Sequence, residues 1–133
     1  MTSGHTITTE HSTARVQIVV CGATIADSTA AVLLHETGLP VRYYLPPDDI
    51  DMERLVPTET VSTCPFKGEA VYWSVNVDGT IAPDVAWSYP TPIPERIDIA
   101  GFICFFNERV DEIVVDGVGL ERPETQWSTS AEV

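Results

Sequence analysis

Hydrophobic and polar positions alternate along most of the chain, in short runs that glycine and proline interrupt. In residues 14–22 the side chains of Val16, Ile18 and Val20 fall on one face of an extended strand, because successive strand residues point to opposite sides. Similar runs that end in turn residues occupy 24–28, 41–46, 69–77, 84–90, 99–106 and 112–117. Residues 30–38 fit either a strand or a short helix. The pattern predicts roughly seven or eight short strands and a mostly β fold.

One segment has helical rather than strand character. Asp48 or Asp49 is placed to cap a helix, and Glu53 lies near the position that completes such a cap. The sequence therefore predicts at most one short helix, near residues 48–55.

The two ends of the chain lack the alternation seen in the middle. Residues 1–13 are rich in Thr, Ser and His without an apolar period, which predicts a flexible tail. Residues 121–133 predict a second tail, in which Trp127 is able to dock onto the body. The length between them suits one β domain over residues 14–120.

Aromatic side chains concentrate in three of the predicted strands. Trp87 and Tyr89 are two residues apart and share one face of their strand, and Trp73 lies in the strand before them. Asp78-Gly79 between these strands is typical of a tight hairpin turn. If the strands pair, several rings line one concave surface of the kind that holds flat or cationic small molecules. The alternative is a packed aromatic core.

The charge of the chain limits its partners. Seven Lys plus Arg stand against 20 Asp plus Glu, which gives a net charge of −13. Such a surface repels phosphate backbones and anionic lipids, so we expect neither a nucleic-acid nor a membrane partner. No apolar run is long enough for a membrane-spanning helix, and the first residues lack a signal-peptide pattern. We therefore expect a cytoplasmic protein.

The three cysteines, Cys21, Cys64 and Cys104, are scattered along the sequence. An odd number without close pairing does not predict a disulfide framework, and structural zinc sites need closely spaced ligands. His35 is the one histidine between the two predicted tails, and it lacks the second histidine of a zinc-protease motif. We therefore expect no metal and no cofactor.

The densest group of reactive residue types is "CPFKGE", residues 64–69. Proline restricts its own backbone and that of Cys64, and Gly68 permits a turn that other residues disfavour. Lys67 is held three residues from the thiol, where it would favour the thiolate. Glu69 is positioned to pair with Lys67 or to act as an acid or base. The alternatives are an inert thiol and two exposed charges.

Four stretches of the sequence together resemble a known family. In chain order they are "ETGLPVRYYLPPDDI", "CPFKGEAVYWSV", "AWSYPTPIPE" and "IAGFICFF". From about Val16 to Gly117 the chain is similar to the family of domains of unknown function numbered 427 (DUF427). The resemblance implies a β-tent of two antiparallel sheets. The family is sometimes labelled nucleotidyltransferase-like, but the sequence has neither the motifs nor the basic residues of a triphosphate site.

Three functional hypotheses remain open. The first is a small-ligand-binding β domain with the Cys-Pro-x-Lys-Gly turn at its rim; its predicted contacts are Arg42, Tyr44, Lys67, Trp73, Trp87 and Tyr89. The second is an enzyme that uses Cys64 as a thiolate tuned by Lys67, with Glu69 or Asp49 as acid or base. The third is an interaction scaffold without a small ligand. The ligand, any reaction and the oligomeric state are not predicted.

Overall fold

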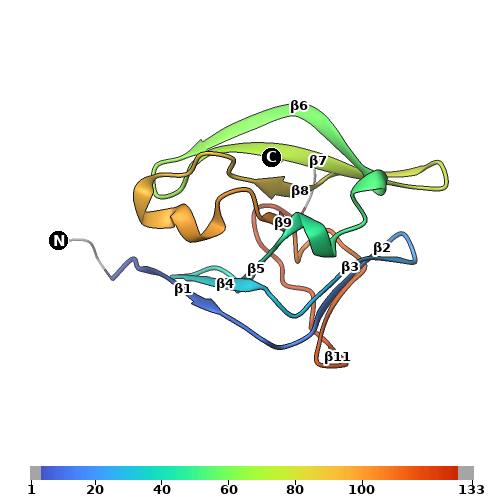
Figure 1. The fold of residues 1–133 in the computed structure, drawn as a ribbon, viewed down its shortest axis with the longest axis horizontal. Coiled ribbons are helices and arrows are strands. Elements are labelled where there is room, and N and C mark those ends of the chain that lie inside the picture. Colours follow the sequence, from blue (N-terminus) through green and yellow to red (C-terminus); the bar gives the residue numbers. More distant parts are fainter. Residues whose placement is uncertain (1–3, 129–133) are drawn as a thin grey trace.

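A computed structural model describes residues 4–128 of the chain as two antiparallel β-sheets (Figure 1). The larger sheet has the strand order β1 (Ile7–His11), β4 (Val32–Glu36), β5 (Arg42–Leu45), β9 (Ile103–Phe105), β8 (Thr80–Ser88), β7 (Gly68–Val77) and β6 (Leu55–Cys64). The smaller sheet has the order β11 (Val118–Gly119), β10 (Glu112–Val115), β2 (Val16–Val20) and β3 (Ala23–Ser28). The predicted mostly β fold of two antiparallel sheets is confirmed.

The larger sheet buries side chains on both of its faces. Leu45 and Ala86 belong to a hydrophobic cluster that also contains Val16 and Ile18 of the smaller sheet. Their neighbours Tyr44 and Trp87 belong to a second cluster. Because adjacent strand residues point to opposite sides, the two clusters lie on opposite faces of the larger sheet. One face of the larger sheet therefore packs against the smaller sheet, and the second cluster lies on the other face.

The second face is concave because the larger sheet bends over on itself. Figure 1 shows β6, β7 and β8 above and β1, β4 and β5 below, with β9 between them. The second cluster draws residues from both of these parts, for example Leu34 from β4 and Tyr72 from β7. The 3₁₀ segment η3 (Pro94–Ile99) contributes Ile99 to the same cluster.

The N-terminal segment contains a paired strand. Strand β1 forms the edge of the larger sheet, with Ile7 opposite Glu36 and His11 opposite Val32. The expected flexible tail over residues 1–13 is therefore wrong for 7–11, where β-branched Ile and Thr residues suit an edge strand.

The C-terminal segment also contacts the body of the protein. The backbone carbonyl of Trp127 accepts a hydrogen bond of 2.8 Å from Arg109 Nε. The expectation that Trp127 docks onto the body is met. The remaining parts of the two predicted tails, residues 1–3 and 129–133, lie outside the described residues.

The segment with helical character is irregular. It contains two single 3₁₀ turns, η1 (Pro47–Asp49) and η2 (Met52–Arg54), in place of one continuous helix. Between them Ile50 is buried and bridges Ala26 of β3, which draws the chain out of a helical path. No side chain caps either turn; the Asp49 carboxylate instead accepts a hydrogen bond of 2.7 Å from the Ser28 hydroxyl.

Strand β6 was not predicted from the sequence. Its "LVPTETVSTC" has only one buried residue, Leu55, because β6 is the other edge of the larger sheet. Because β6 has polar threonines on both faces, it lacks the hydrophobic alternation that is typical of half-buried strands. Within residues 4–128, no helix has the length and apolar character to cross a membrane.

Candidate functional site

A row of four side chains crosses the concave face of the larger sheet. The strand register places Tyr44 opposite Cys104, Cys104 opposite Trp87, and Trp87 opposite Tyr72. The rings of Tyr44 and Trp87 meet edge to face, with centroids 6.2 Å apart, and Trp87 Nε1 donates a hydrogen bond of 3.2 Å to the Tyr44 hydroxyl. Tyr44, Trp87 and Tyr72 of this row line a pocket, and Cys104 lies buried between Tyr44 and Trp87.

Trp73 does not belong to this row. The predicted hairpin forms, but its register pairs Trp73 with Ala86, and Ala86 faces the cluster between the two sheets. Trp73 packs against that cluster and donates a hydrogen bond of 3.3 Å to the Ser88 hydroxyl. The expectation that Trp73 and Trp87 wall one pocket is therefore wrong, and Tyr72 takes the place assigned to Trp73.

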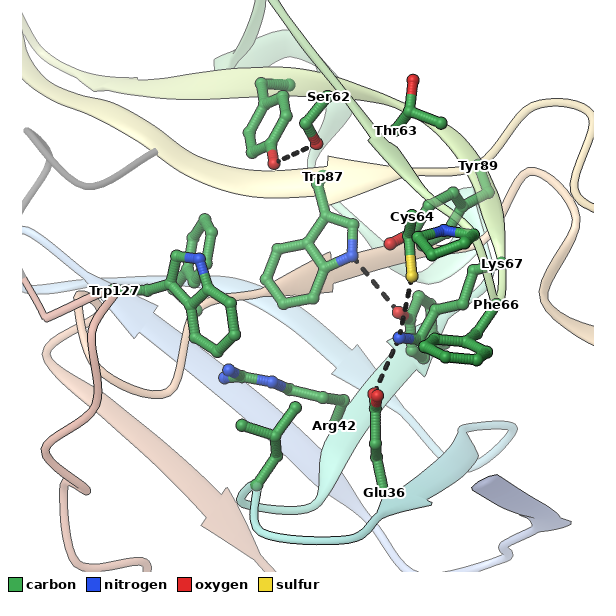
Figure 2. A pocket seen from close by; sticks show the side chains of 15 residues that line it. Glu36, Arg42, Ser62, Thr63, Cys64, Phe66, Lys67, Trp87, Tyr89 and Trp127 are labelled. Carbon is green, nitrogen blue, oxygen red and sulfur yellow. Dashed lines mark hydrogen bonds and ion pairs between the residues drawn. The ribbon is translucent and has the colours of Figure 1, made fainter. Parts of the chain in front are cut away.

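The pocket has a volume of about 400 Å³. Its aromatic walls come from Trp87, Phe106 and Trp127, and one end carries Glu36, Cys64, Lys67 and Tyr89 (Figure 2). Of the six predicted ligand contacts, five line it: Arg42, Tyr44, Lys67, Trp87 and Tyr89. The volume lies within the range of small-molecule sites, which are concave and mostly apolar with a few convergent polar groups.

Arg42 lies in the pocket wall as half of a buried ion pair. Its guanidinium donates to both carboxylate oxygens of Glu108, at 2.6 and 2.9 Å, and to Asn107 Oδ1 at 3.0 Å. The Arg42 Cζ atom lies 5.4 Å from the ring centroid of Trp87 and 5.7 Å from that of Trp127. Burial alone would raise the pKa of Glu108, but Arg42 outweighs it and lowers that pKa. Arg42 therefore organises the aromatic walls.

Lys67 is the only lysine in the sequence, and its side chain is 9% exposed. Its Nζ donates hydrogen bonds to Glu36 Oε1 at 2.7 Å and to Cys64 Sγ at 3.6 Å. The other oxygen of Glu36 lies 3.0 Å from His5 Nε2. Burial alone would raise the pKa of Glu36, but Lys67 and His5 outweigh it and lower that pKa. Glu36 is therefore a carboxylate that holds the Lys67 ammonium beside the thiol.

The turn that carries these groups is fixed by its own backbone. Lys67 N donates to the Cys64 carbonyl at 3.1 Å, and the Lys67 carbonyl accepts from Ile93 N at 2.9 Å. Gly68 has a φ of +128°, and a Cβ atom there would lie 3.1 Å from Pro92 Cα. Only glycine fits this conformation and this close approach. The predicted turn at the pocket rim is present, and residues 91–93 support it.

Tyr89 lies at the same end of the pocket and is 6% exposed. Its hydroxyl has no hydrogen-bond partner among the described residues. Figure 2 shows Tyr89 beside Cys64. Burial first, and then Cys64, raise the pKa of Tyr89 well above its usual range. The phenol therefore stays protonated and offers a hydrogen-bond donor to the pocket.

The residues expected to assist a Cys64 enzyme are not at the pocket. Glu69 is exposed, lies opposite Thr63 in the hairpin and does not line the pocket. Asp49 bonds Ser28 at η1, and His35 lies 2.7 Å from the Glu10 carboxylate on β1. The acid and base roles proposed for Glu69 and Asp49 therefore lack a structural basis.

The other two thiols differ from Cys64 in their surroundings. Cys104 is fully buried, and burial raises its pKa to about 12. Cys21, expected in an apolar strand, is partly exposed in the β2–β3 turn with a φ of +50°. Within residues 4–128 no group of three or more His, Cys, Asp or Glu side chains is arranged to hold a metal ion.

Sequence reasoning missed three important pocket residues. Glu36 follows His35, and the two were considered only as part of a zinc-protease motif. The Glu36 carboxylate was therefore not predicted as a pocket residue. Phe106 was assigned to an apolar strand, although it follows the end of β9 and faces the pocket. Trp127 was expected to dock without a stated place, and its position depends on contacts with residues far away in sequence.

Together, the fold and the pocket define a two-sheet β domain with an aromatic cavity and a short, stiff turn at its rim. The chain matches the family described as a domain of unknown function (DUF427) over residues 8–116, and it belongs to that family. No curated protein matches the chain in sequence.

Proposed function

We propose that this protein binds a flat, aromatic small molecule that carries a hydrogen-bond acceptor. The observation that supports this most strongly is the Tyr89 side chain, which is 6% exposed, lines a pocket with aromatic walls and carries a hydroxyl without a hydrogen-bond partner among the described residues. A ligand oxygen in the pocket would accept a hydrogen bond from this hydroxyl.

The charges of the pocket favour a neutral acceptor, such as a ketone or amide oxygen. Lys67 is neutralised by Glu36, and Arg42 by Glu108, so an added ligand charge has no unpaired partner at either group. An anionic ligand would also approach a chain with a net charge of −13. A cationic ligand would meet the Arg42 guanidinium already placed among the aromatic rings. The same acidic surface leads us to propose a small-molecule partner rather than a nucleic acid or a membrane.

The proposal can be tested with three compounds that share one ring system. 2-Acetylnaphthalene has a ketone, 2-ethylnaphthalene has no acceptor, and 2-naphthylmethylamine is a cation. We expect calorimetric titration to give at least fivefold tighter binding for the ketone than for either of the others. The Tyr89→Phe variant should bind the ketone and the hydrocarbon equally, because residue 89 would then have no hydroxyl to donate to the ketone oxygen.

The matched control is Trp73→Phe, which changes an aromatic residue on the opposite face of the same sheet. It should preserve the preference for the ketone. Equal affinity of the wild-type protein for the ketone and the hydrocarbon would contradict the role of Tyr89. Absence of binding by all three compounds would favour a scaffold without a small ligand.

A further inference from the structure

The end of the pocket at the Cys64–Gly68 turn combines a nucleophile with two hydrogen-bond donors. Cys64 Sγ lies 3.6 Å from Lys67 Nζ, and Glu36 fixes that ammonium from the other side at 2.7 Å. Reactive cysteines occur in such partly exposed surroundings, beside a positive group. Tyr89, 6% exposed and without a hydrogen-bond partner in the described chain, adds a second donor beside the thiol.

The groups around Cys64 restrict the chemistry that it can perform. Displacement of a leaving group generally needs an acid to protonate that group or a base to activate water. Glu36 is engaged by Lys67 and His5, and Glu69 does not line the pocket. Addition without a leaving group needs only a nucleophile and donors for the oxygen on which negative charge develops. Lys67 and Tyr89 are suited to that second role.

We infer that Cys64 adds covalently to flat, aryl-substituted α,β-unsaturated ketones bound in this pocket. The inference rests on the proposed function, because the same aromatic walls and the same Tyr89 hydroxyl hold the ketone before it reacts. The unsaturated ketone keeps the ring, the double bond and the carbonyl in one plane, which matches a cavity walled by Trp87, Phe106 and Trp127.

The reaction is a conjugate addition in which all atoms are retained. The sulfur attacks the β-carbon and forms a carbon–sulfur bond, while the π electrons of the double bond move toward the carbonyl and give an enolate. Lys67 and Tyr89 donate hydrogen bonds to the enolate oxygen. The proton that left the thiol is returned through water to the α-carbon, so the product is a saturated thioether ketone. Neither an oxidant nor a leaving group is involved.

The test compares the rates at which benzylideneacetone modifies Cys64 and Cys21, read by peptide mass spectrometry near neutral pH. Cys21 is a suitable reference because it is also partly exposed but lies in the β2–β3 turn, outside the pocket. Each rate is divided by the rate of iodoacetamide labelling at the same cysteine, which corrects for simple thiol reactivity. We expect a normalised rate at least tenfold higher at Cys64 than at Cys21.

Two variants test the donors. Tyr89→Phe removes a hydroxyl that has no partner in the described residues, so the fold should persist, and Lys67→Gln removes the ammonium. Each should lower the normalised rate at Cys64 at least fivefold and leave Cys21 unchanged. An equal normalised rate at the two cysteines would overturn the inference. A Cys64 rate unchanged in both variants would also overturn it.

The saturated analogue benzylacetone separates this inference from the proposed function. It has no double bond to attack, so we expect it to bind, to leave no adduct, and to slow Cys64 modification without affecting Cys21. If benzylacetone binds while benzylideneacetone leaves Cys64 unmodified, thiol addition is wrong and ligand binding stands. If neither benzylacetone nor the flat ketone 2-acetylnaphthalene binds or competes, the proposed function fails, and any Cys64 adduct would reflect the reactivity of the thiol alone.

Discussion

Tyr44 and Tyr89 lie with their ring centroids 6.5 Å apart in one aromatic cluster, but their hydroxyls differ in their partners. The Tyr44 hydroxyl accepts a hydrogen bond from Trp87 Nε1, whereas the Tyr89 hydroxyl has no partner in the part of the chain that the structure describes. The two phenols of one cluster therefore differ in role. The Tyr44 hydroxyl is used within the pocket wall, whereas the Tyr89 hydroxyl still has its hydrogen-bond donor unused within the described residues.

The first prediction compares the removal of each hydroxyl. Tyr44→Phe leaves the Trp87 indole N–H buried without its acceptor, which should cost about 1–3 kcal/mol in the free energy of unfolding. Tyr89→Phe should cost nothing or stabilise slightly, because no hydrogen bond within the described chain is lost. Urea unfolding of both variants gives the comparison. A larger loss for Tyr89→Phe would show that its hydroxyl already serves the fold.

The second prediction concerns the buried pair of Arg42 and Glu108. Glu108→Gln should lower the free energy of unfolding by about 3–5 kcal/mol, because it leaves the buried Arg42 guanidinium without its counter-charge. The control is Asp27→Asn, which breaks the exposed pair with Arg15 at 2.7 Å and should change the free energy of unfolding far less, because water screens exposed charges. Similar losses in the two variants, measured by urea unfolding, would contradict a structural role for the buried pair.

The third prediction follows from the lowered pKa of Glu36. A carboxylate whose pKa is lower in the folded than in the unfolded protein stabilises the fold above its unfolded value, about 4.3. That stabilisation is lost as the pH falls through the folded value. Glu36→Gln should therefore be less stable than wild type at pH 7, and its stability should fall less from about pH 5 downward. The measurement is the thermal midpoint against pH.

Glu69→Gln provides the control for the pH experiment. This change also removes one carboxylate, but Glu69 is exposed and forms no ion pair within the described residues. Its pH profile should follow that of the wild-type protein. A Glu36→Gln profile parallel to wild type would show that the contact with Lys67 does not contribute to folding.

The fourth prediction tests the turn at the rim of the pocket. Gly68→Ala should destabilise the protein by more than Gly38→Ala, although both glycines have positive φ angles. A Cβ at Gly38 meets no atom within 4 Å, whereas one at Gly68 would lie 3.1 Å from the Pro92 backbone. The left-handed conformation alone costs about 1–2 kcal/mol for a residue with a Cβ. Thermal unfolding should show a cost near that range at Gly38 and a larger cost at Gly68.

The general fold was predictable because the strands of the interior follow a simple alternation. Val16, Ile18 and Val20 are all buried, as their spacing indicates. The edge strands β1 and β6 were missed because each has a solvent-facing side and few apolar residues. An edge strand is defined by its pairing partner, and hydrophobic periodicity carries little information about that partner.

The pocket was predictable in its residue types and less so in its register. Lys67, Trp87 and Tyr89 were correctly grouped, since they lie in or next to one hairpin. Trp73 was the wrong choice because the two-residue turn at Asp78-Gly79 pairs Val77 with Thr80. The alternation of side chains from that turn places Tyr72, and not Trp73, on the same face as Trp87.

The central claim is that an acceptor on an aromatic ligand bonds to the Tyr89 hydroxyl inside the pocket. The most direct test is a crystal structure of the complex with 2-acetylnaphthalene, at a concentration a few times its dissociation constant. The account predicts the naphthalene ring against Trp87 and the ketone oxygen about 2.7–2.8 Å from the Tyr89 oxygen. A ligand bound outside the pocket, or inside it with the ketone directed away from Tyr89, would contradict the account.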